Sequence, residues 1–261
     1  MNKLDKVRDP AHVALSVRTM TVADVRDALR LGLADFMAIP THGVLFGLFY
    51  AIAGLLLVTV VVERALLPLI VPLVGGFALL GPFASVGFYA LSKRRDSGAE
   101  TRWWHMLEGY RTAAAGSLLG LGLVLAAIFL LWMVVAAGLT DLLLGPLPTA
   151  IPAALGVLFA STEGWTLMLV GGVVGLGFAL FVFAISVVAF PLILDREIDA
   201  ITAANTSIRA VRLNPGPMVA WALIVAVLLG FGALPVLLGL PVVLPVLGHA
   251  TWHLYRKVMP D

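Results

Sequence analysis

Six long stretches of this sequence are apolar and contain no Asp, Glu, Lys or Arg. An α-helix needs about 20 consecutive apolar residues to cross the hydrocarbon of a bilayer. The chain is 61% hydrophobic and only 12% charged, which leaves too little polar surface for the exterior of a soluble domain. The sequence therefore predicts an all-α, polytopic transmembrane helical bundle, with spans at about 43–62, 66–91, 114–138, 165–194, 218–237 and 240–255.

The basic residues are sorted between the two sides of these spans. With six spans, all of the 17 Lys and Arg residues except Arg64 fall on the side that holds both termini. Because basic loops stay in the cytoplasm, we predict cytoplasmic N- and C-termini and a location in the inner (cytoplasmic) membrane. We expect a flexible N-terminal segment over residues 1–20, a single integral-membrane domain over 21–257 and a tail over 258–261.

Three polar segments on the predicted cytoplasmic side each precede a pair of spans: 21–38, about 100–112, and 196–213. In the first segment, Thr21 and Asp24 have the spacing of a helix capping box. Its apolar residues recur at helical spacing: Val22, Val25, Leu29, Leu33 and Phe36. We predict amphipathic surface helices here and hypothesise a threefold helix-plus-hairpin repeat. The alternative is that any helical hairpin tends to have proline near its ends and basic residues at its cytoplasmic exit.

Two further patterns concern helix packing. Residues 139–163 contain three prolines and almost no charge, so we interpret them as an interfacial or re-entrant element on the opposite side of the membrane. Small residues four positions apart allow helices to approach closely in lipid. That spacing predicts close packing within the protomer at three pairs: Gly43/Gly47, Gly116/Gly120 and Gly171/Gly175.

Two histidines are candidate functional residues. His249 and His253 are four residues apart, so a helix places them on one face. Neutral imidazoles in this arrangement could bind a metal or haem. The favoured alternative is that they anchor the helix at the headgroups, beside Trp252 and Tyr255. We predict no metal and no cofactor.

Two charged runs are candidate binding surfaces. Lys93, Arg94 and Arg95 precede Trp103 and Trp104, a combination typical of contact with lipid headgroups. A solvated loop with ordinary aromatic anchors is the alternative. A second run has mixed charge and is interpreted either as a docking surface or as a self-neutralising cap where the fourth span ends. Its charged members are Asp195, Arg196, Glu197 and Asp199. We expect Asp195 and Arg196 to pair with groups elsewhere on this face, such as Asp35 or Arg212.

Several classes of function are disfavoured by the sequence. Proton relays and charge-coupled pumps place ionisable groups deep in the membrane, and the predicted spans have none there. The chain has no cysteine and therefore no thiolate chemistry. The Gly-rich run 172–177 lies inside a predicted span, where a phosphate-binding loop is not expected. The basic residues follow the membrane sidedness, so we predict no nucleic-acid partner.

Three segments resemble one family. They are 190–203, which includes Phe190-Pro191-Leu192-Ile193-Leu194-Asp195-Arg196-Glu197-Ile198-Asp199; 214–218; and 243–256. Gly81-Pro82-Phe83 and Asp35-Phe36 fit the same pattern. Together they resemble the bacterial integral-membrane family known as domain of unknown function 2189. The resemblance implies a bacterial membrane protein, and some family members bear a respiratory-oxidase label.

These observations leave three functions open. The favoured one is a non-catalytic accessory protein that binds lipid or a partner in the membrane, where the partner is another membrane complex or a second copy of the chain. The alternative is a transporter or channel for a small apolar or lipid-like molecule, which needs no buried charge. The second alternative, implied by the resemblance, is an accessory subunit of a respiratory-oxidase-type complex.

Overall fold

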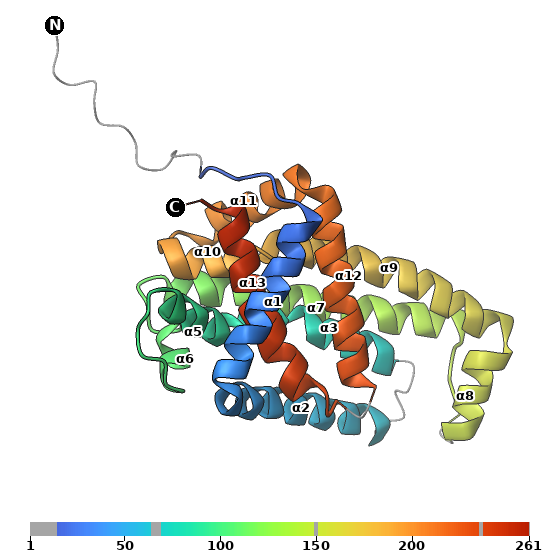
Figure 1. Cartoon of the computed structure of the whole chain (residues 1–261). Coiled ribbons are helices and arrows are strands. Elements are labelled where there is room, and N and C mark those ends of the chain that lie inside the picture. The colour runs from blue at the N-terminus through green and yellow to red at the C-terminus, as the bar shows by residue number, and fades with distance from the viewer. Residues whose placement is uncertain (1–14, 64–68, 149–150, 235–236, 261) are drawn as a thin grey trace, which may run out of the picture.

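The computed structural model describes residues 15–63, 69–148, 151–234 and 237–260. Every regular element within these ranges is an α-helix (Figure 1), so the prediction of an all-α fold is confirmed. The helices are α1 (Val22–Ala38), α2 (Pro40–Glu63), α3 (Ile70–Leu79), α4 (Gly81–Ala84), α5 (Val86–Asp96), α6 (His105–Glu108), α7 (Ala115–Leu143), α8 (Ile151–Ala160), α9 (Thr162–Ser186), α10 (Ala189–Arg196), α11 (Ala200–Leu213), α12 (Pro215–Ala233) and α13 (Leu240–Val258).

Four helical stretches are long and apolar enough to cross a membrane: Gly43–Val60, Ala115–Leu143, Thr162–Arg196 and Pro215–Ala233. They coincide with the predicted first, third, fourth and fifth spans, although residues 235–236 lie outside the described part of the chain. Many large apolar side chains of these helices are exposed, as expected for surfaces that face lipid. The polytopic membrane class is therefore supported by four spans rather than six.

The segments predicted as the second and sixth spans have a different character. Residues 69–91 are divided among α3, α4 and α5, and residues 66–68 of that predicted span lie outside the described chain. α13 has 19 residues, but its C-terminal half carries histidines and basic residues, and most of its side chains are buried inside the protein. The six-span arrangement is consequently not confirmed.

α13 is the central helix of the polar end of the molecule. It packs against α1, α2, α5 and α12, and it runs antiparallel to α1 and α2. This direction follows from the paired contacts. On α1, Asp27 bonds to Lys257 and a Cβ on Gly32 would meet Ala250; on α2, a Cβ on Gly43 would meet Pro245 and one on Gly47 would meet Pro241. Glycine at these positions lets the helix backbones approach closely.

The glycine pairs of the sequence have unequal outcomes. Gly43 and Gly47 pack on α13, so this prediction is confirmed. Gly116 and Gly120 have no neighbour within 4 Å where a Cβ would stand, so that prediction is wrong for the isolated chain. In the third pair, Gly175 packs against Trp132 of α7, whereas Gly171 faces open space.

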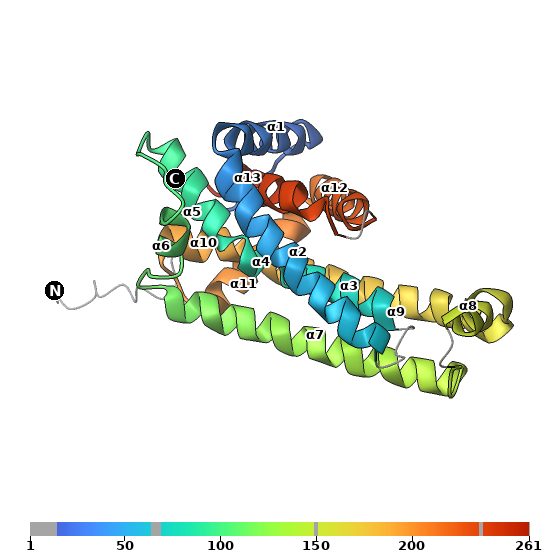
Figure 2. The ribbon, with the colours of Figure 1, turned by 90° about the horizontal axis from the view of Figure 1, so that it is seen from below.

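α7 and α9 lie side by side and extend away from the polar end, with α8 at their far tips (Figures 1 and 2). α8 falls within the segment 139–163 and packs against α9. Trp132 joins α7 to its neighbours, because its indole Nε1–H donates to the carbonyl oxygen of Pro72 at 2.9 Å and its ring packs on Gly175. The two long helices thus form an extension whose tips are remote from both described chain ends.

The polar segments before the spans differ in length. α1 is a 17-residue helix that begins with the predicted capping box of Thr21 and Asp24. α11 has 14 residues, capped by Asp199. Between residues 100 and 112, by contrast, only the four-residue α6 forms. The threefold repeat is therefore not confirmed, because its middle member lacks a comparable helix.

The predicted flexible segment 1–20 lies mainly outside the described chain. Residues 15–20 run without helical structure along the polar end. The backbone N–H of Arg18 donates to Val258, and Arg209 donates to the carbonyl of Leu15. These contacts connect the segment to α13 and α11.

Candidate functional site

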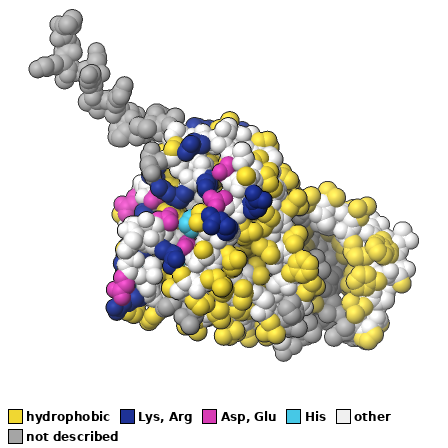
Figure 3. Space-filling model, viewed as in Figure 1, with side chains coloured by type: hydrophobic (Ala, Val, Ile, Leu, Met, Phe, Trp, Pro, Cys, Tyr) yellow, Lys and Arg dark blue, Asp and Glu magenta, His cyan; other side chains and the backbone are white. Residues whose placement is uncertain are grey.

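Charged side chains gather over one part of the molecule, whereas the surface toward the tips of α7 and α9 is mainly hydrophobic (Figure 3). The described members of this charged face come mainly from α1, α5, α10, α11 and α13. Two clusters of interacting polar side chains lie within it, one around Asp35 and one around Asp195. We refer to them as the Asp35 cluster and the Asp195 cluster.

The Asp35 cluster joins three helices. Asp35 of α1 is only 6% exposed. Its Oδ2 accepts from Ser92 Oγ of α5 at 2.6 Å and lies 2.8 Å from His253 Nε2 of α13. Its Oδ1 lies 2.9 Å from Arg95 Nε of α5. A buried carboxylate needs such partners, because an unpaired charge in this environment is strongly unfavourable.

The spacing of small residues explains this meeting point. Gly32 of α1 packs directly on Ala250 of α13. Asp35 and His253 each lie three residues, about one helical turn, after these contact residues, and because the helices are antiparallel they lie on opposite sides of the contact. Side chains on a helix lean toward its N-terminus, so both of these lean back toward the contact. The close approach of the two backbones therefore brings the carboxylate and the imidazole together.

Ser92 connects Asp35 to the second histidine. Its Oγ lies 2.8 Å from His249 Nδ1, and both side chains are buried. A hydroxyl has one proton to donate. While Asp35 is ionised, Ser92 donates that proton to Asp35, and His249 must then carry its own proton on Nδ1 and donate to Ser92 Oγ.

This hydrogen-bond order differs from that of a nucleophilic triad. In a triad the serine gives its proton to histidine, and the carboxylate orients that histidine. Here Ser92 donates directly to the carboxylate, and the side chain of Ser92 has no exposed surface. The arrangement is that of a polar clamp between helices rather than an activated nucleophile.

The electrostatics of Asp35 follow from its partners. Burial alone would raise the pKa of this carboxyl, but hydrogen bonds from His253 and Ser92 outweigh burial and hold its pKa below the ordinary value. The ionised form is therefore the one that the cluster stabilises. Nearby, hydrogen bonds from Lys257 and Arg30 lower the pKa of Asp27 to about 2.

The Asp195 cluster lies at the C-terminal end of α10. Asp195 Oδ1 is 3.0 Å from Lys93 Nζ, and its Oδ2 accepts from Tyr255 Oη at 2.6 Å. Lys93 also donates to the carbonyls of Leu194 and Asp195 at 3.3 Å. These carbonyls lie at the C-terminal end of α10, where the helix dipole stabilises a positive charge. Arg256 approaches Oδ2 at 3.8 Å. The expected pairing of Asp195 is confirmed, with these partners in place of Asp35 or Arg212.

The remaining residues of the mixed-charge run form the turn between α10 and α11. Arg196 donates to the carbonyl of Pro260. Glu197 is exposed and adopts a left-handed conformation with φ of 52° as α10 ends. Asp199 accepts from the backbone N–H of Thr202 at 2.8 Å and caps α11. Three of the four predicted residues thus make structural contacts, and Glu197 is left facing solvent.

The basic run before Trp103 is engaged inside the protein. Lys93 pairs with Asp195, Arg94 with Glu108 at 3.0 Å, and Arg95 with Asp35. Trp103 and Trp104 remain exposed and contact each other edge to face. The Arg102 guanidinium lies 5.1 Å from the Trp104 ring centroid, within range of a cation–π interaction. Of the five predicted headgroup contacts, the tryptophans are therefore the more available.

The two predicted histidines lie in the Asp35 cluster, but each bonds to a protein group. Within the described residues, no group of three or more His, Asp or Glu side chains is arranged to hold a metal ion. The side chain of His42, the other histidine that could have contributed, lies outside the described part of the chain.

Sequence reasoning did not select Asp35, Ser92 or Tyr255 as site residues. A signal for Asp35 was present, because Ala28, Gly32 and Asp35 follow one another at helical spacing on the buried face of α1. An acidic residue on the packed side of an amphipathic helix indicates a buried polar partner. No comparable signal marked Ser92, which stands within an apolar run.

The fold and these clusters define a helical integral membrane protein with a polar face. Residues 70–195 match the family model described as predicted integral membrane protein (DUF2189), which confirms the resemblance seen in the sequence. The match includes α3 to α9, nearly all of α10, and Asp195 at its end; the resembling segments at 214–218 and 243–256 lie beyond it. No curated protein and no solved structure matches the chain.

Proposed function

We propose that this chain is a non-catalytic accessory protein of the bacterial inner membrane that binds lipid and a partner membrane complex at its charged face. The observation that carries the proposal is the mutual pairing of the buried polar groups on that face. Asp35, His249 and His253 bond to one another through Ser92 or directly. Side chains committed in this way hold helices together and are not poised for proton transfer to a substrate.

The exposed groups of the same face support a binding role. Trp103 and Trp104 project at the charged end beside Arg102. Indole rings favour the membrane–water interface, where their apolar body and polar N–H are both accommodated. We propose that these two tryptophans contact headgroups of the inner leaflet. Lys93, Arg94 and Arg95 are paired with carboxylates of the protein but remain partly exposed, and we propose that they support this contact from behind the tryptophans.

The topology belongs to the same proposal. We propose six membrane passages, with α3–α5 forming the second and α13 the sixth, and both termini in the cytoplasm. The support is the distribution of Lys and Arg, which leaves only Arg64 on the other side. In this arrangement α1 and α11 are related surface helices of the first and third units of a repeat.

Site-specific cross-linking tests the proposed binding face. A photoreactive amino acid in place of Trp103 should capture lipid or one recurrent membrane protein in intact cells. The matched control is Trp165, which is also exposed but lies on α9 near α8. Equal capture of the same species at both positions would contradict a specific binding face.

Cofactor analysis tests the proposal that the protein is not catalytic. The gently solubilised protein should show no haem spectrum and no stoichiometric metal. The alternative function as an oxidase-type subunit would be supported by bound zinc, copper or iron, or by haem, that is lost in His249→Ala or His253→Ala. Such a result would overturn the accessory function.

A further inference from the structure

The beginnings of α1 and α12 are joined by one side chain. Asn214 stands immediately before α12, and its Oδ1 accepts from the backbone N–H of Met20 at 2.7 Å. Its Nδ2 donates to the carbonyl of Arg18 at 3.0 Å. Asn214 is only 2% exposed. The two helices therefore start at a common point on the charged face and run onward in contact with each other.

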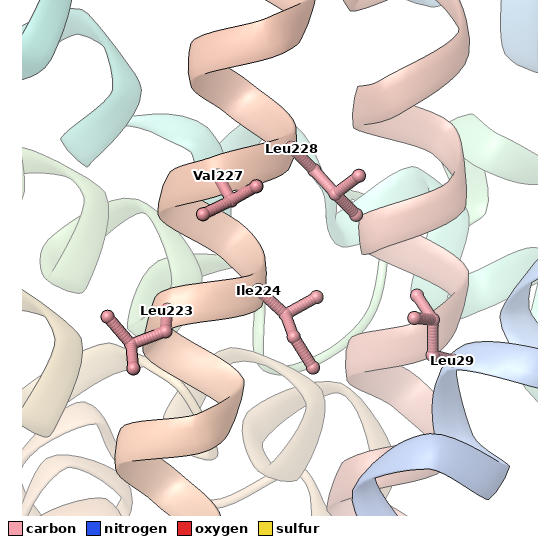
Figure 4. A pocket seen from close by; sticks show the side chains of 5 residues that line it. All are labelled: Leu29, Leu223, Ile224, Val227 and Leu228. Atoms are coloured by element: carbon pink, nitrogen blue, oxygen red, sulfur yellow. The ribbon is translucent and has the colours of Figure 1, made fainter.

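About two and a half helical turns beyond this junction, an open groove of about 360 Å³ lies between the two helices (Figure 4). Ile224 and Leu228 of α12 point toward Leu29 of α1, and two more apolar side chains of α12 line its flank. The complete lining is Leu29, Leu223, Ile224, Val227 and Leu228. The lining is entirely hydrocarbon, so it suits an aliphatic occupant.

α12 places the groove in contact with lipid. Pro215–Ala233 is apolar enough to cross the membrane. Val219, Leu223, Val227 and Phe231 recur every four residues along it, and all four are more than half exposed. This stripe continues the groove along the helix, so a lipid chain can enter from the surrounding bilayer without passing through the protein.

Two arginines stand on the side of the groove that faces the junction at Asn214. Arg26 stands three residues before Leu29 on α1, and Arg212 stands two residues before Asn214. Both are exposed, and neither has a carboxylate partner within the described chain. Arg30, by comparison, is paired with Asp27 at 2.7 Å. Two uncommitted guanidinium groups near the start of an apolar groove match an anionic head above an acyl chain.

We propose that this groove is a binding site for one anionic phospholipid, with an acyl chain against Leu29, Leu223 and Ile224 and its phosphate near Arg26 and Arg212. The inference deepens the proposed lipid contact and rests on residence in the membrane. It assigns that contact to a site formed by α1 and α12, distinct from Trp103 and Trp104.

Lipid retention measured by native mass spectrometry tests this site. The full chain is extracted from vesicles that contain equal amounts of phosphatidylglycerol and phosphatidylcholine, and the lipid that remains bound is counted. One phosphatidylglycerol should be retained at least about tenfold more often than phosphatidylcholine, because each basic residue near an anionic headgroup favours binding. Equal retention of both lipids by the unmodified protein would overturn the proposal without any variant.

Two variants locate the retained lipid. Arg26→Gln combined with Arg212→Gln should lower phosphatidylglycerol retention about tenfold, whereas Arg111→Gln, at an exposed arginine between α6 and α7, should leave it unchanged. Leu223→Trp should fill the groove and displace the lipid, whereas Val134→Trp, at an exposed apolar position of α7, should not. Retention that is unaffected by both site variants would overturn the proposal.

Two other outcomes have separate meanings. A dimer that is lost in Leu223→Trp would assign the groove to a second copy of the chain and overturn the lipid site. Cross-linking at Trp103 is independent of this groove. If that cross-linking succeeds while lipid retention fails, the proposed accessory function stands and only the groove assignment falls.

Discussion

Asp35 lies one helical turn after Gly32 on α1, and the close contact of Gly32 with Ala250 of α13 lets its carboxylate reach His253. Both carboxylate oxygens are used, since Oδ1 faces Arg95 and Oδ2 accepts from Ser92. This buried carboxylate has three partners on two other helices, so it holds α1, α5 and α13 together. At the residue scale, the stability of the charged face therefore depends on this side chain.

Replacement of Asp35 by Asn tests this role. The amide cannot reproduce a carboxylate, because its NH₂ group would oppose one of the donors that now faces Asp35. We expect the free energy of unfolding of the solubilised protein to fall by about 1–3 kcal/mol. Thermal unfolding of Asp35→Asn followed by circular dichroism measures this change. Glu100→Gln removes an exposed charge paired with Arg102 and should change it by less than about 1 kcal/mol; equal effects would contradict a special role for Asp35.

Asp27 gives a pH-dependent prediction. Its pKa is lowered from 3.8 to about 2 by Lys257 and Arg30. A carboxyl with a depressed folded-state pKa stabilises the fold fully above its unfolded pKa and loses that contribution as pH falls through its folded pKa. The difference in thermal midpoint between the protein and Asp27→Asn should thus be present at pH 7 and shrink from about pH 4 toward pH 2.

The size of this effect is bounded by the surface location of the pair. Ion pairs at partly exposed sites contribute less than about 1 kcal/mol. High salt at pH 7 should reduce the same difference, because it screens the attraction of Lys257. A difference that stays constant with pH would contradict the assigned ion pair.

At the scale of elements, α13 holds the charged face together through close contacts at glycine. A Cβ at Gly32 would lie 2.4 Å from the backbone nitrogen of Ala250, and one at Gly248 would lie 2.7 Å from the Phe88 ring. These approaches allow α1 and α5 to contact the same part of α13, around residues 248–250. The polar side chains of all three helices can then meet across the short distances that hydrogen bonds require.

Gly32→Ala should separate α1 from α13. The backbone of Ala250 cannot yield as a flexible side chain would, so we expect a loss of about 1–3 kcal/mol in the free energy of unfolding. The matched control is Gly120→Ala on α7, where the new methyl group meets no atom within 4 Å. That substitution should stabilise the helix by about 0.5–1 kcal/mol. Parallel thermal unfolding of both variants measures the contrast, and a neutral Gly32→Ala would contradict the packing assigned to α1.

At the scale of the whole molecule, the polar and apolar regions are segregated. The charged face contains both described ends of the chain, and the α7–α9 extension leads away from it (Figures 1 and 3). In the proposed orientation the charged face lies in the cytoplasm, and α8 lies toward the opposite surface. Each described loop then has a definite side of the membrane.

Cysteine labelling measures this sidedness, and the chain has no native cysteine to interfere. Single cysteines at the exposed positions Ser97 and Asn205 should resist an impermeant thiol reagent in intact cells, whereas Thr162→Cys should react. Ser207 is unsuitable because its side chain is buried. All three cysteines should react after permeabilisation. Labelling of Asn205→Cys from outside intact cells would overturn the proposed topology.

The sequence by itself determined the membrane class, the all-helical fold, four of the long helices and the capped start of α1. These features depend on local signals, namely uninterrupted apolar runs, helical periodicity and the spacing of Thr21 and Asp24. The family resemblance was likewise available from short motifs. The same local signals did not show that the predicted second span is divided among α3, α4 and α5, because hydropathy alone does not reveal breaks between helices.

Only the tertiary structure decided which polar groups meet. Asp35 and His253 are 218 positions apart, and Ser92 lies 157 positions before His249. Their contacts depend on the antiparallel packing of α1 on α13 and on the glycines that permit it. Similarly, the sequence predicts that Lys93 and Arg95 are available to lipid headgroups. In the structure they pair with carboxylates, Lys93 with Asp195 of α10 and Arg95 with Asp35 of α1. Such pairings are set by distances between helices, and no local pattern of residues encodes those distances.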